Sequence, residues 1–246
     1  MKTAQTILIT GATSGIGRHT ALALAKAGHR VFATGRRISA LASLRREAAG
    51  TRLETLELDV TSAESIASAK SEVDRRTGGY GVDALINNAG YGAMGPLEEI
   101  SDEVLRAQYD TNVFGLMAVI RSFLPQMRER GFGRIVNISS IGGLVPSPMM
   151  GAYSSTKYAV EALSDALRIE LRPFGIQVSI IEPGAIATEF NGLAVSSLPS
   201  GEKSPYQGAI EHSHAVFAQF ARASVGAEHV TRAIFSALFS KSPSAR

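Results

Sequence analysis

The sequence of 246 residues contains no cysteine and no tryptophan, and its formal net charge is only +3. The absence of cysteine excludes disulfides, thiolate nucleophiles and cysteine-ligated metals. The five histidines are scattered, and His212 and His214, two residues apart, fall on different faces of a helix, so we expect no metal site. The pairs Arg45–Arg46 and Arg75–Arg76 have acidic neighbours. We therefore expect solvated helix faces there and no nucleic-acid partner.

Long hydrophobic runs are also missing. The first apolar stretch, Ile7–Ile9, is too short for the core of a signal peptide, and Thr10–Gly11 interrupts it. No later run reaches the length that spans a bilayer. We expect a cytoplasmic protein without a membrane span.

What the sequence does have is an alternation of short apolar runs with longer amphipathic segments. The expected strands are Thr6–Thr10, Arg30–Thr34, Leu53–Leu58, Ala84–Asn87, Arg134–Ser139 and Gln177–Glu182. The expected helices include Gly15–Ala27, Ser62–Arg76, Glu103–Arg130 and Ser154–Arg172. Repeated strand–helix–strand units, with strands apolar on both faces, predict a parallel sheet covered on both sides. The fold class is α/β, a single doubly wound Rossmann domain over residues 1–246.

Two segments break this rhythm. Asn191–Pro205 is rich in Gly, Ser and Pro and precedes a moderately apolar segment, Tyr206–Ala223. Together they predict a substrate loop and lid over residues 191–223. The polar tail Lys241–Arg246 is expected to be frayed.

A glycine-rich turn directly follows the first expected strand. Gly11, Gly15 and Gly17 let the backbone turn tightly and approach a pyrophosphate, with Thr13, Ser14 and Ile16 between them. The helix that starts there adds unpaired N–H groups and a positive dipole end. A glycine turn alone is also compatible with a purely structural turn, but its position after strand one predicts a dinucleotide site.

Four motifs, in order, resemble those of the short-chain dehydrogenase/reductase family. They are Thr10-Gly11-x-x-x-Gly15-Ile16-Gly17, Asn87-Asn88-Ala89-Gly90, Tyr153-Ser-Ser-Thr-Lys157 and Pro183-Gly184 with Thr188. The resemblance implies cofactor contacts from Asn88, Ala89 and Gly90, and from Pro183, Gly184, Ile186 and Thr188 around the carboxamide. The stretches Gly95–Leu97, Phe123–Met127 and Pro173–Val178 are most similar to the hydroxysteroid and retinol dehydrogenase branch.

The end of the second strand predicts which cofactor binds. NAD-preferring enzymes place an acid there, whereas this chain has Gly35 followed by Arg36 and Arg37. A guanidinium binds a 2′-phosphate, so we expect NADP(H), with Arg36 as the main contact and Arg37 as a second. The alternative is a surface arginine pair opening a helix. Asp59 and Val60 resemble the family's adenine-binding pair, and Asp59 is also suited to cap the next helix.

Tyr153 and Lys157 are the expected catalytic acid/base pair. They are four residues apart on one helix and share a face. A neighbouring ammonium favours the phenolate, so we expect it to lower the pKa of Tyr153. The resemblance also implies that Lys157 contacts the nicotinamide ribose. A tyrosine–lysine pair alone is compatible with a solvated helix face.

Two further polar residues complete the expected site. Ser140 matches the family serine that orients the substrate oxygen, with Ser139 as the competing choice. Asn112 matches the asparagine that completes a proton relay. Its alternative is a polar residue within a long helix, bonded to its own backbone.

Family members usually add a last strand after the final helix, here Ala227–Ser240, but the sequence stops within a few residues of it, so either the chain has been shortened or this edge is missing. We therefore predict six strands, and a homodimer through the long helices near residues 103–130 and 153–172.

The substrate is expected to be a small, hydrophobic alcohol or carbonyl compound. Its expected pocket is lined by Leu144, Val145, Met149, Met150, Leu193, Val195, Leu198, Phe217 and Phe220. Two other hypotheses are an NADP-binding sensor without turnover and another Rossmann enzyme, such as a methyltransferase. The tyrosine–lysine pair argues against both, and Arg36 argues against the methyltransferase.

Overall fold

A single parallel sheet forms the centre of the protein. The computed structural model describes residues 4–190 and 204–246. The strands are β1 (Thr6–Ile9), β2 (Arg30–Gly35), β3 (Leu53–Glu57), β4 (Ala84–Asn87), β5 (Gly133–Ile138) and β6 (Ile176–Ile181). Their order is β3-β2-β1-β4-β5-β6, and every neighbouring pair is parallel. The order reverses between β1 and β4, and ligands of doubly wound sheets bind outside the carboxyl ends of strands at such a point.

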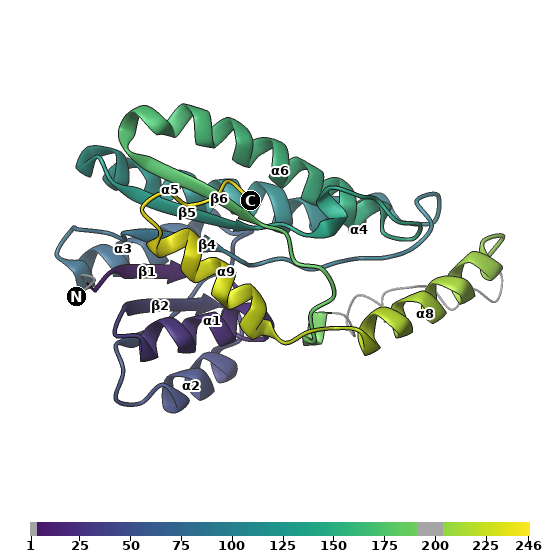
Figure 1. Cartoon of the computed structure of the whole chain (residues 1–246), viewed down its shortest axis with the longest axis horizontal. Helices are drawn as coiled ribbons and strands as arrows, with labels where there is room; N and C mark the ends of the chain where they lie inside the picture. The colour runs from purple at the N-terminus through teal and green to yellow at the C-terminus, as the bar shows by residue number, and fades with distance from the viewer. Residues whose placement is uncertain (1–3, 191–203) are drawn as a thin grey trace.

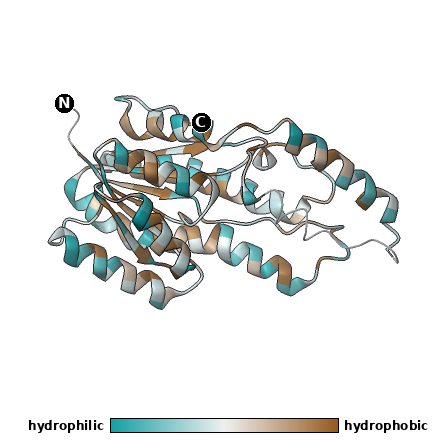
Figure 2. Ribbon diagram, turned by 90° about the horizontal axis from the view of Figure 1, so that it is seen from below, coloured by the Kyte–Doolittle hydropathy of each residue, from teal (hydrophilic) through white to brown (hydrophobic). Residues whose placement is uncertain are grey.

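Helices cover both faces of the sheet (Figure 1). One face carries α1 (Gly15–Lys26), α2 (Ile38–Glu47) and α9 (Ala227–Phe239), and the other carries α3 (Ala63–Thr77), α5 (Leu116–Arg130) and α6 (Gly151–Leu171). Hydrophobic residues are concentrated in the strands between these layers (Figure 2). Two apolar cores result, because the side chains of each strand point alternately to the two faces. The predicted fold class and the six parallel strands are confirmed.

The helix expected over Glu103–Arg130 is not continuous. It consists of α4 (Asp102–Tyr109), a π-helix η1 (Asp110–Gly115) and α5. Gly115 packs closely on the loop after β3: a Cβ there would lie 2.7 Å from the carbonyl oxygen of Val60. A π-helix turn changes the direction of the side chains that follow, and such turns are frequent at functional sites.

The tail after α9 is not frayed, so that prediction was wrong. The Ile180 amide donates to the carbonyl of Ala245 over 2.9 Å, and the Ser179 hydroxyl donates to the carbonyl of Ser244 over 2.7 Å. The tail therefore covers the outer edge of β6. An exposed edge of unpaired backbone groups is unfavourable, and the tail partly satisfies it.

The helix α8 (Gln207–Arg222) extends away from the sheet (Figure 1). The residues just before it are held to the loop before α4, where Ser204 donates to Glu99 over 2.6 Å and Tyr206 donates to Glu98. The expected lid over 191–223 is thus described only from residue 204 onwards, because 191–203 lie outside the described residues.

The described residues also allow two general observations. Among residues 4–190 and 204–246, no helix combines the length and the apolar character that crossing a bilayer requires. In the same ranges, His, Asp and Glu side chains do not gather in any group of three or more that would hold a metal ion.

Candidate active site

The glycine-rich turn between β1 and α1 is built for close approach. Gly11 and Gly15 have φ angles of 65° and 52°, in the left-handed region that favours glycine. Ser14 is the N-cap of α1, and its side chain makes no capping hydrogen bond within the described chain. No acidic residue lies in the first turn of α1. The first N–H groups of this helix are therefore directed to a site suited to an anion.

Asn88 braces this turn from the neighbouring strand. Its side-chain amide donates to the carbonyl oxygens of Thr10 and Gly11, each over 3.0 Å. The hydroxyl of Thr10 in turn accepts from the backbone amides of Asn88 and Ala89. A Cβ on Gly17 would lie 2.4 Å from both the Asn88 amide nitrogen and the Gly11 carbonyl oxygen. The second expected motif therefore positions the first.

The two arginines after β2 lie beside this turn. Arg36 is 69% exposed and lies 3.9 Å from Asp59, and Arg37 donates to the backbone and hydroxyl oxygens of Thr13 over 3.4 Å. Burial alone would raise the pKa of Asp59, but hydrogen bonds from Thr61 and the charge of Arg36 lower it. Arg37 also lies 3.9 Å from Glu189, so the structure brings two acids and two guanidinium groups to the end of β2.

Asp59 does not cap the next helix, so that alternative was wrong. Its carboxylate accepts from the backbone amide and the hydroxyl of Thr61. The N-cap of α3 is Ser62, whose side chain accepts from the Ser65 amide. Three residues separate Asp59 from the start of α3, too many for an N-cap. Val60, the other residue of the expected pair, is buried beside Gly115.

Tyr153, Lys157 and Ser140 meet at the carboxyl end of β5. Tyr153 is 5% exposed and shares a side-chain hydrogen bond with Ser140. The Lys157 ammonium donates to the carbonyl of Ile138 over 2.8 Å and lies 5.7 Å from the centre of the Tyr153 ring. Ser139, the competing serine, is buried, and its hydroxyl has no hydrogen-bond partner within the described chain. Of the two serines, Ser140 is the one that contacts Tyr153.

The pKa of Tyr153 is shifted in the direction opposite to the one expected. Burial raises the pKa of Tyr153 to about 12, and the hydrogen bond with Ser140 only partly opposes it. Burial lowers the pKa of Lys157 to about 8, while the charge of Glu161 raises it. The expectation that Lys157 lowers the pKa of Tyr153 is therefore wrong for the protein alone. Removing both groups from water disfavours both charges, and the ammonium is too far away to compensate.

Asn112 lies in the π-helix and bonds outside its own helix. Its amide donates to the Tyr91 carbonyl over 2.9 Å and to the Thr156 hydroxyl over 3.0 Å, and its oxygen accepts from the Tyr91 amide over 3.1 Å. The alternative of a bond to its own backbone is contradicted. A Cβ on Gly90 would lie 3.1 Å from the Asn112 oxygen and 3.7 Å from the Lys157 nitrogen. Gly90 therefore lies against both side chains.

The segment after β6 closes the other side of the glycine turn. The Pro183 carbonyl accepts from the Ile141 amide over 3.0 Å, next to Ser140. Ile186 forms a parallel bridge with Val225, and a Cβ on Gly15 would lie 3.2 Å from Thr188. A Cβ on Gly184 would meet no described atom within 4 Å. The fourth motif thus spans the distance from the Ser140 loop to the glycine-rich turn.

An apolar cluster lies next to Tyr153. The rings of Tyr153 and Phe190 are 5.5 Å apart, and Phe190 packs with Met94, Met149 and Ile210. Three other residues complete the cluster, namely Met150, Tyr206 and Phe217. Of the expected pocket residues, Met149, Met150 and Phe217 belong to it, whereas Leu144, Val145 and Phe220 are exposed. Leu193, Val195 and Leu198 lie outside the described residues.

Sequence reasoning missed Met94 and Ile210. The Gly95 amide donates to the Met149 carbonyl over 2.8 Å, which brings Met94 against Met149 across 55 residues of sequence. No local pattern indicates this contact. Only the low polarity of the segment 92–97 hints at a buried position.

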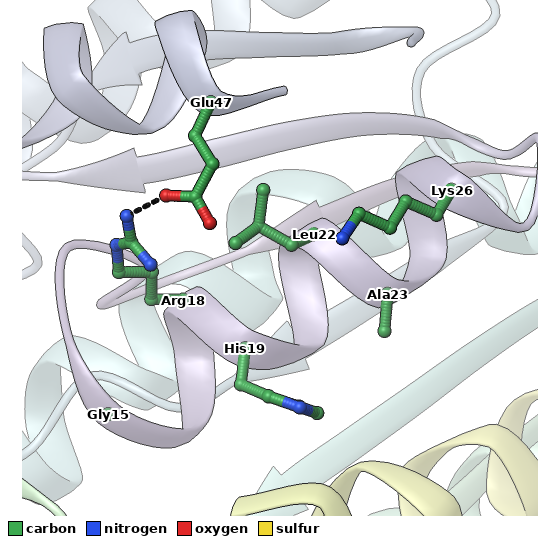
Figure 3. Close-up of a pocket in the computed structure, with 7 residues that line it drawn as sticks. All are labelled: Gly15, Arg18, His19, Leu22, Ala23, Lys26 and Glu47. Carbon is green, nitrogen blue, oxygen red and sulfur yellow. Dashed lines mark hydrogen bonds and ion pairs between the residues drawn. The ribbon is translucent and has the colours of Figure 1, made fainter. Parts of the chain in front are cut away.

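A separate depression of about 480 Å³ lies on the outer face of α1 (Figure 3). It is lined by Gly15, Arg18, His19, Leu22, Ala23, Lys26 and Glu47, and Arg18 and Glu47 form an ion pair across it. It shares only Gly15 with the expected site residues and does not contain Tyr153 or Lys157. The depression therefore lies apart from the expected catalytic residues at the carboxyl end of the sheet.

Comparison with known proteins identifies similar chains. The family model described as short chain dehydrogenase matches residues 5–197. A 3-ketodihydrosphingosine reductase from Bacteroides thetaiotaomicron is 40% identical over 202 residues, which cover 82% of this chain and 71% of that protein. Human 17-beta-hydroxysteroid dehydrogenase type 1 is 38% identical over 192 residues, 75% of this chain but only 57% of that protein. A crystal structure of a variant actinorhodin polyketide ketoreductase with NADPH has a TM-score of 0.81 at 32% identity, over 100% of this chain and 94% of that chain.

Proposed function

The chain is a member of the short-chain dehydrogenase family, and from that premise we propose that it is an NADP(H)-dependent oxidoreductase that interconverts an alcohol and a carbonyl. The methyltransferase hypothesis is contradicted by this membership.

One chain of contacts carries the proposal. Lys157 lies against Gly90, and the preceding Ala89 lies against Gly11: a Cβ on Gly11 would be 2.8 Å from the Ala89 Cα. The short segment Asn88–Gly90 thus lies between the proposed catalytic ammonium and the phosphate-binding turn. Because the two sites share this segment, a cofactor with phosphates on the turn has its other end within reach of Tyr153.

The residues present fit a dinucleotide. The glycines leave a cradle that side chains would fill, and the first N–H groups of α1 face it without an acidic neighbour. Arg36 and Arg37 supply positive charge at the end of β2, and each lies 3.9 Å from a carboxylate that a bound 2′-phosphate would replace as its partner. The similar ketoreductase structure holds NADPH. NADP(H), when bound, supplies or accepts the hydride.

Each catalytic residue has a proposed task. Tyr153 donates a proton to the carbonyl oxygen in reduction and removes the hydroxyl proton in oxidation. Ser140, bonded to Tyr153, orients the substrate oxygen. Lys157 contacts the nicotinamide ribose when the cofactor is bound, and Asn112 connects Lys157 to the proton relay. The high pKa of Tyr153 in the protein alone suits proton retention until substrate and cofactor charges are in place.

The substrate we propose is hydrophobic. The cluster around Met149 and Phe190 places apolar side chains next to the Tyr153 ring. The two curated relatives are named for a ketodihydrosphingosine and for a hydroxysteroid, both largely apolar molecules. We also propose that the described part of the 191–223 segment contributes Ile210 and Phe217 to this pocket. In this proposal the segment belongs to the same single domain as the sheet.

The homodimer is likewise a proposal. The region near residues 103–130 exposes Val104 and Phe114, and α6 exposes Ile169. Large apolar side chains on adjoining helices are typical of protein contacts. Light scattering of the purified protein distinguishes a dimer from a monomer, and a monomer at micromolar concentration contradicts this part of the proposal.

The enzyme and sensor hypotheses differ in turnover. We would measure NADPH oxidation with a panel of apolar ketones and aldehydes, using wild type, Tyr153→Phe and the control Tyr80→Phe. Tyr80 lies at the opposite end of the sheet and is hydrogen-bonded to Asp83. We expect Tyr153→Phe to lose most activity, Tyr80→Phe to retain it, and all three to bind NADPH. A wild type that binds NADPH but turns over no carbonyl favours the sensor.

A further inference from the structure

A cluster of charged side chains lies one helical turn beyond Lys157. The Arg246 guanidinium contacts three carboxylates: Glu161 at 3.1 Å, Asp165 at 2.9 Å and Glu182 at 2.9 Å. Glu161 and Asp165 lie on α6, and Glu182 directly follows β6. The cluster therefore joins the tail to the helix that carries the proposed catalytic pair.

The backbone of the tail holds Arg246 at this place. Ala245 accepts from the Ile180 amide over 2.9 Å and from the Arg168 guanidinium over 3.2 Å. Because the tail is bonded to both β6 and α6, the Arg246 side chain has little freedom to leave the carboxylates. The fold therefore holds these charged groups together.

Within the cluster, the two acids of α6 differ in burial. The Glu161 side chain is 8% exposed, whereas that of Asp165 is 42% exposed. A buried carboxylate is costly unless charges of opposite sign compensate it. Glu161 follows Lys157 by four residues, so the two side chains share a face of α6. Glu161 thus contacts Arg246 and lies one helical turn from Lys157, and one of its carboxylate oxygens has no hydrogen-bond partner in the described chain.

We propose that Glu161 is a positioning residue for the reaction proposed above: its buried carboxylate is the counter-charge that keeps the Lys157 ammonium protonated beside Tyr153. This assignment rests on the proposed function only in giving Lys157 a catalytic task. The electrostatic link between the two side chains is independent of it.

The charged groups around the pair support this role. Burial lowers the pKa of Lys157 to about 8, and Glu161 opposes that fall. Burial raises the pKa of Glu182, and Glu161 raises it further, while Arg246 lowers it. On α6, Asp165 pairs with Arg168 and Arg246. Without Glu161, burial would lower the pKa of Lys157 unopposed, and the lysine would lose part of its charge at neutral pH.

The test is the titration of Lys157 itself. In protein labelled with ε-carbon-13 lysine, Lys157 is one of six lysines, and its NMR signal is assigned with Lys157→Arg. We expect Glu161→Gln to lower the Lys157 midpoint by about one pH unit, as for the loss of one opposite charge one helical turn away in a partly screened site. The matched control Asp165→Asn removes another Arg246 partner but no charge next to Lys157, and should leave the midpoint unchanged. Glu161→Asp, which keeps the charge, should restore most of it.

Turnover gives the second readout. The alkaline limb of the kcat profile should move to lower pH in Glu161→Gln by the same amount, with activity near wild type at acid pH. A change of fold or packing would instead scale the whole profile. If Glu161→Gln does not fold, Glu161→Met removes the charge and needs no hydrogen bond.

Two results would overturn the inference: an unchanged Lys157 midpoint in Glu161→Gln, or an equal shift in Asp165→Asn. Failure of the proposed function is distinguishable, because Lys157→Arg and Tyr153→Phe would then leave turnover intact whatever the titration shows.

Discussion

Gly17 offers a test in which local preference and tertiary packing predict opposite signs. Gly17 lies in the first turn of α1, where alanine is favoured over glycine by about 1 kcal/mol in an isolated helix. In the folded protein, a Cβ at this position would lie 2.4 Å from the Asn88 amide and 2.4 Å from the Gly11 carbonyl oxygen. Neither contact is possible without movement of the turn or of Asn88.

The cost of Gly17→Ala follows from those contacts. If Asn88 moves, its hydrogen bonds to Thr10 and Gly11 are lost, at about 1 kcal/mol each. Overpacking a well-ordered contact adds about 1–3 kcal/mol. After the helix preference is subtracted, we expect a net destabilisation of about 2–4 kcal/mol, or a fall in Tm of about 4–16 °C for a chain of this size. NADPH affinity should fall as well, because the displaced atoms form the phosphate-binding turn.

The assay is calorimetric unfolding with and without NADPH. Gly208→Ala is the matched control: Gly208 also lies in the first turn of a helix, α8, and a Cβ there would meet no described atom within 4 Å. We expect this control to be as stable as wild type or slightly more stable. A Gly17→Ala protein that matches wild type in Tm and in NADPH affinity would refute the packing argument.

Three further predictions concern charge and burial. Arg36→Asp should weaken NADPH binding about 10–100-fold relative to NADH, as expected for losing a charge-assisted hydrogen bond. The control Arg45→Asp on α2 should leave the ratio of the two affinities unchanged. Titration with both cofactors measures this ratio, and an unaltered ratio in Arg36→Asp removes Arg36 as the phosphate contact. The lowered pKa of Lys157, about 8 against 10.5, means that the unfolded chain holds a proton that the folded chain lacks between these pH values. The wild type should therefore gain about 3 kcal/mol of stability relative to Lys157→Met as pH rises through this window, and the full cost of burying the charged lysine is present below pH 8. Urea titrations at several pH values test this. A difference in free energy of unfolding that stays constant with pH contradicts it. Ser164→Ala leaves the fully buried Asn137 amide without its acceptor at 2.8 Å and should cost about 1–3 kcal/mol in chemical denaturation; an unchanged midpoint would show that water or a new partner replaces the hydroxyl.

Much of the fold was predictable because its cause is periodic. Strands buried on both faces produce runs of apolar residues, and the expected strands agree with those of the structure to within one residue at each end. The four motifs were equally visible, since each is a local sequence attached to a strand end or a helix start. The i, i+4 relation of Tyr153 and Lys157 needs nothing beyond helix geometry.

Other features depend on contacts between distant segments. The π-helix at Asp110–Gly115 interrupts an otherwise continuous helical pattern because Gly115 packs on Val60. The roles of Asn88 as a brace and of Met94 as part of the apolar cluster arise the same way. In each case the residue type was visible, but its partner lies about 50 to 80 residues away in the sequence.

The amino-acid sequence by itself determined the doubly wound architecture, the glycine turn and the Tyr153–Lys157 pair, because periodicity and short-range geometry are written in consecutive residues. Only the tertiary structure decided the ionisation of that pair and the place of the tail. Burial changes the pKa of Tyr153 and Lys157, and Arg246 meets Glu161 across 85 residues of chain. Desolvation and long-range charge depend on which surfaces meet after folding, and no local pattern contains that information.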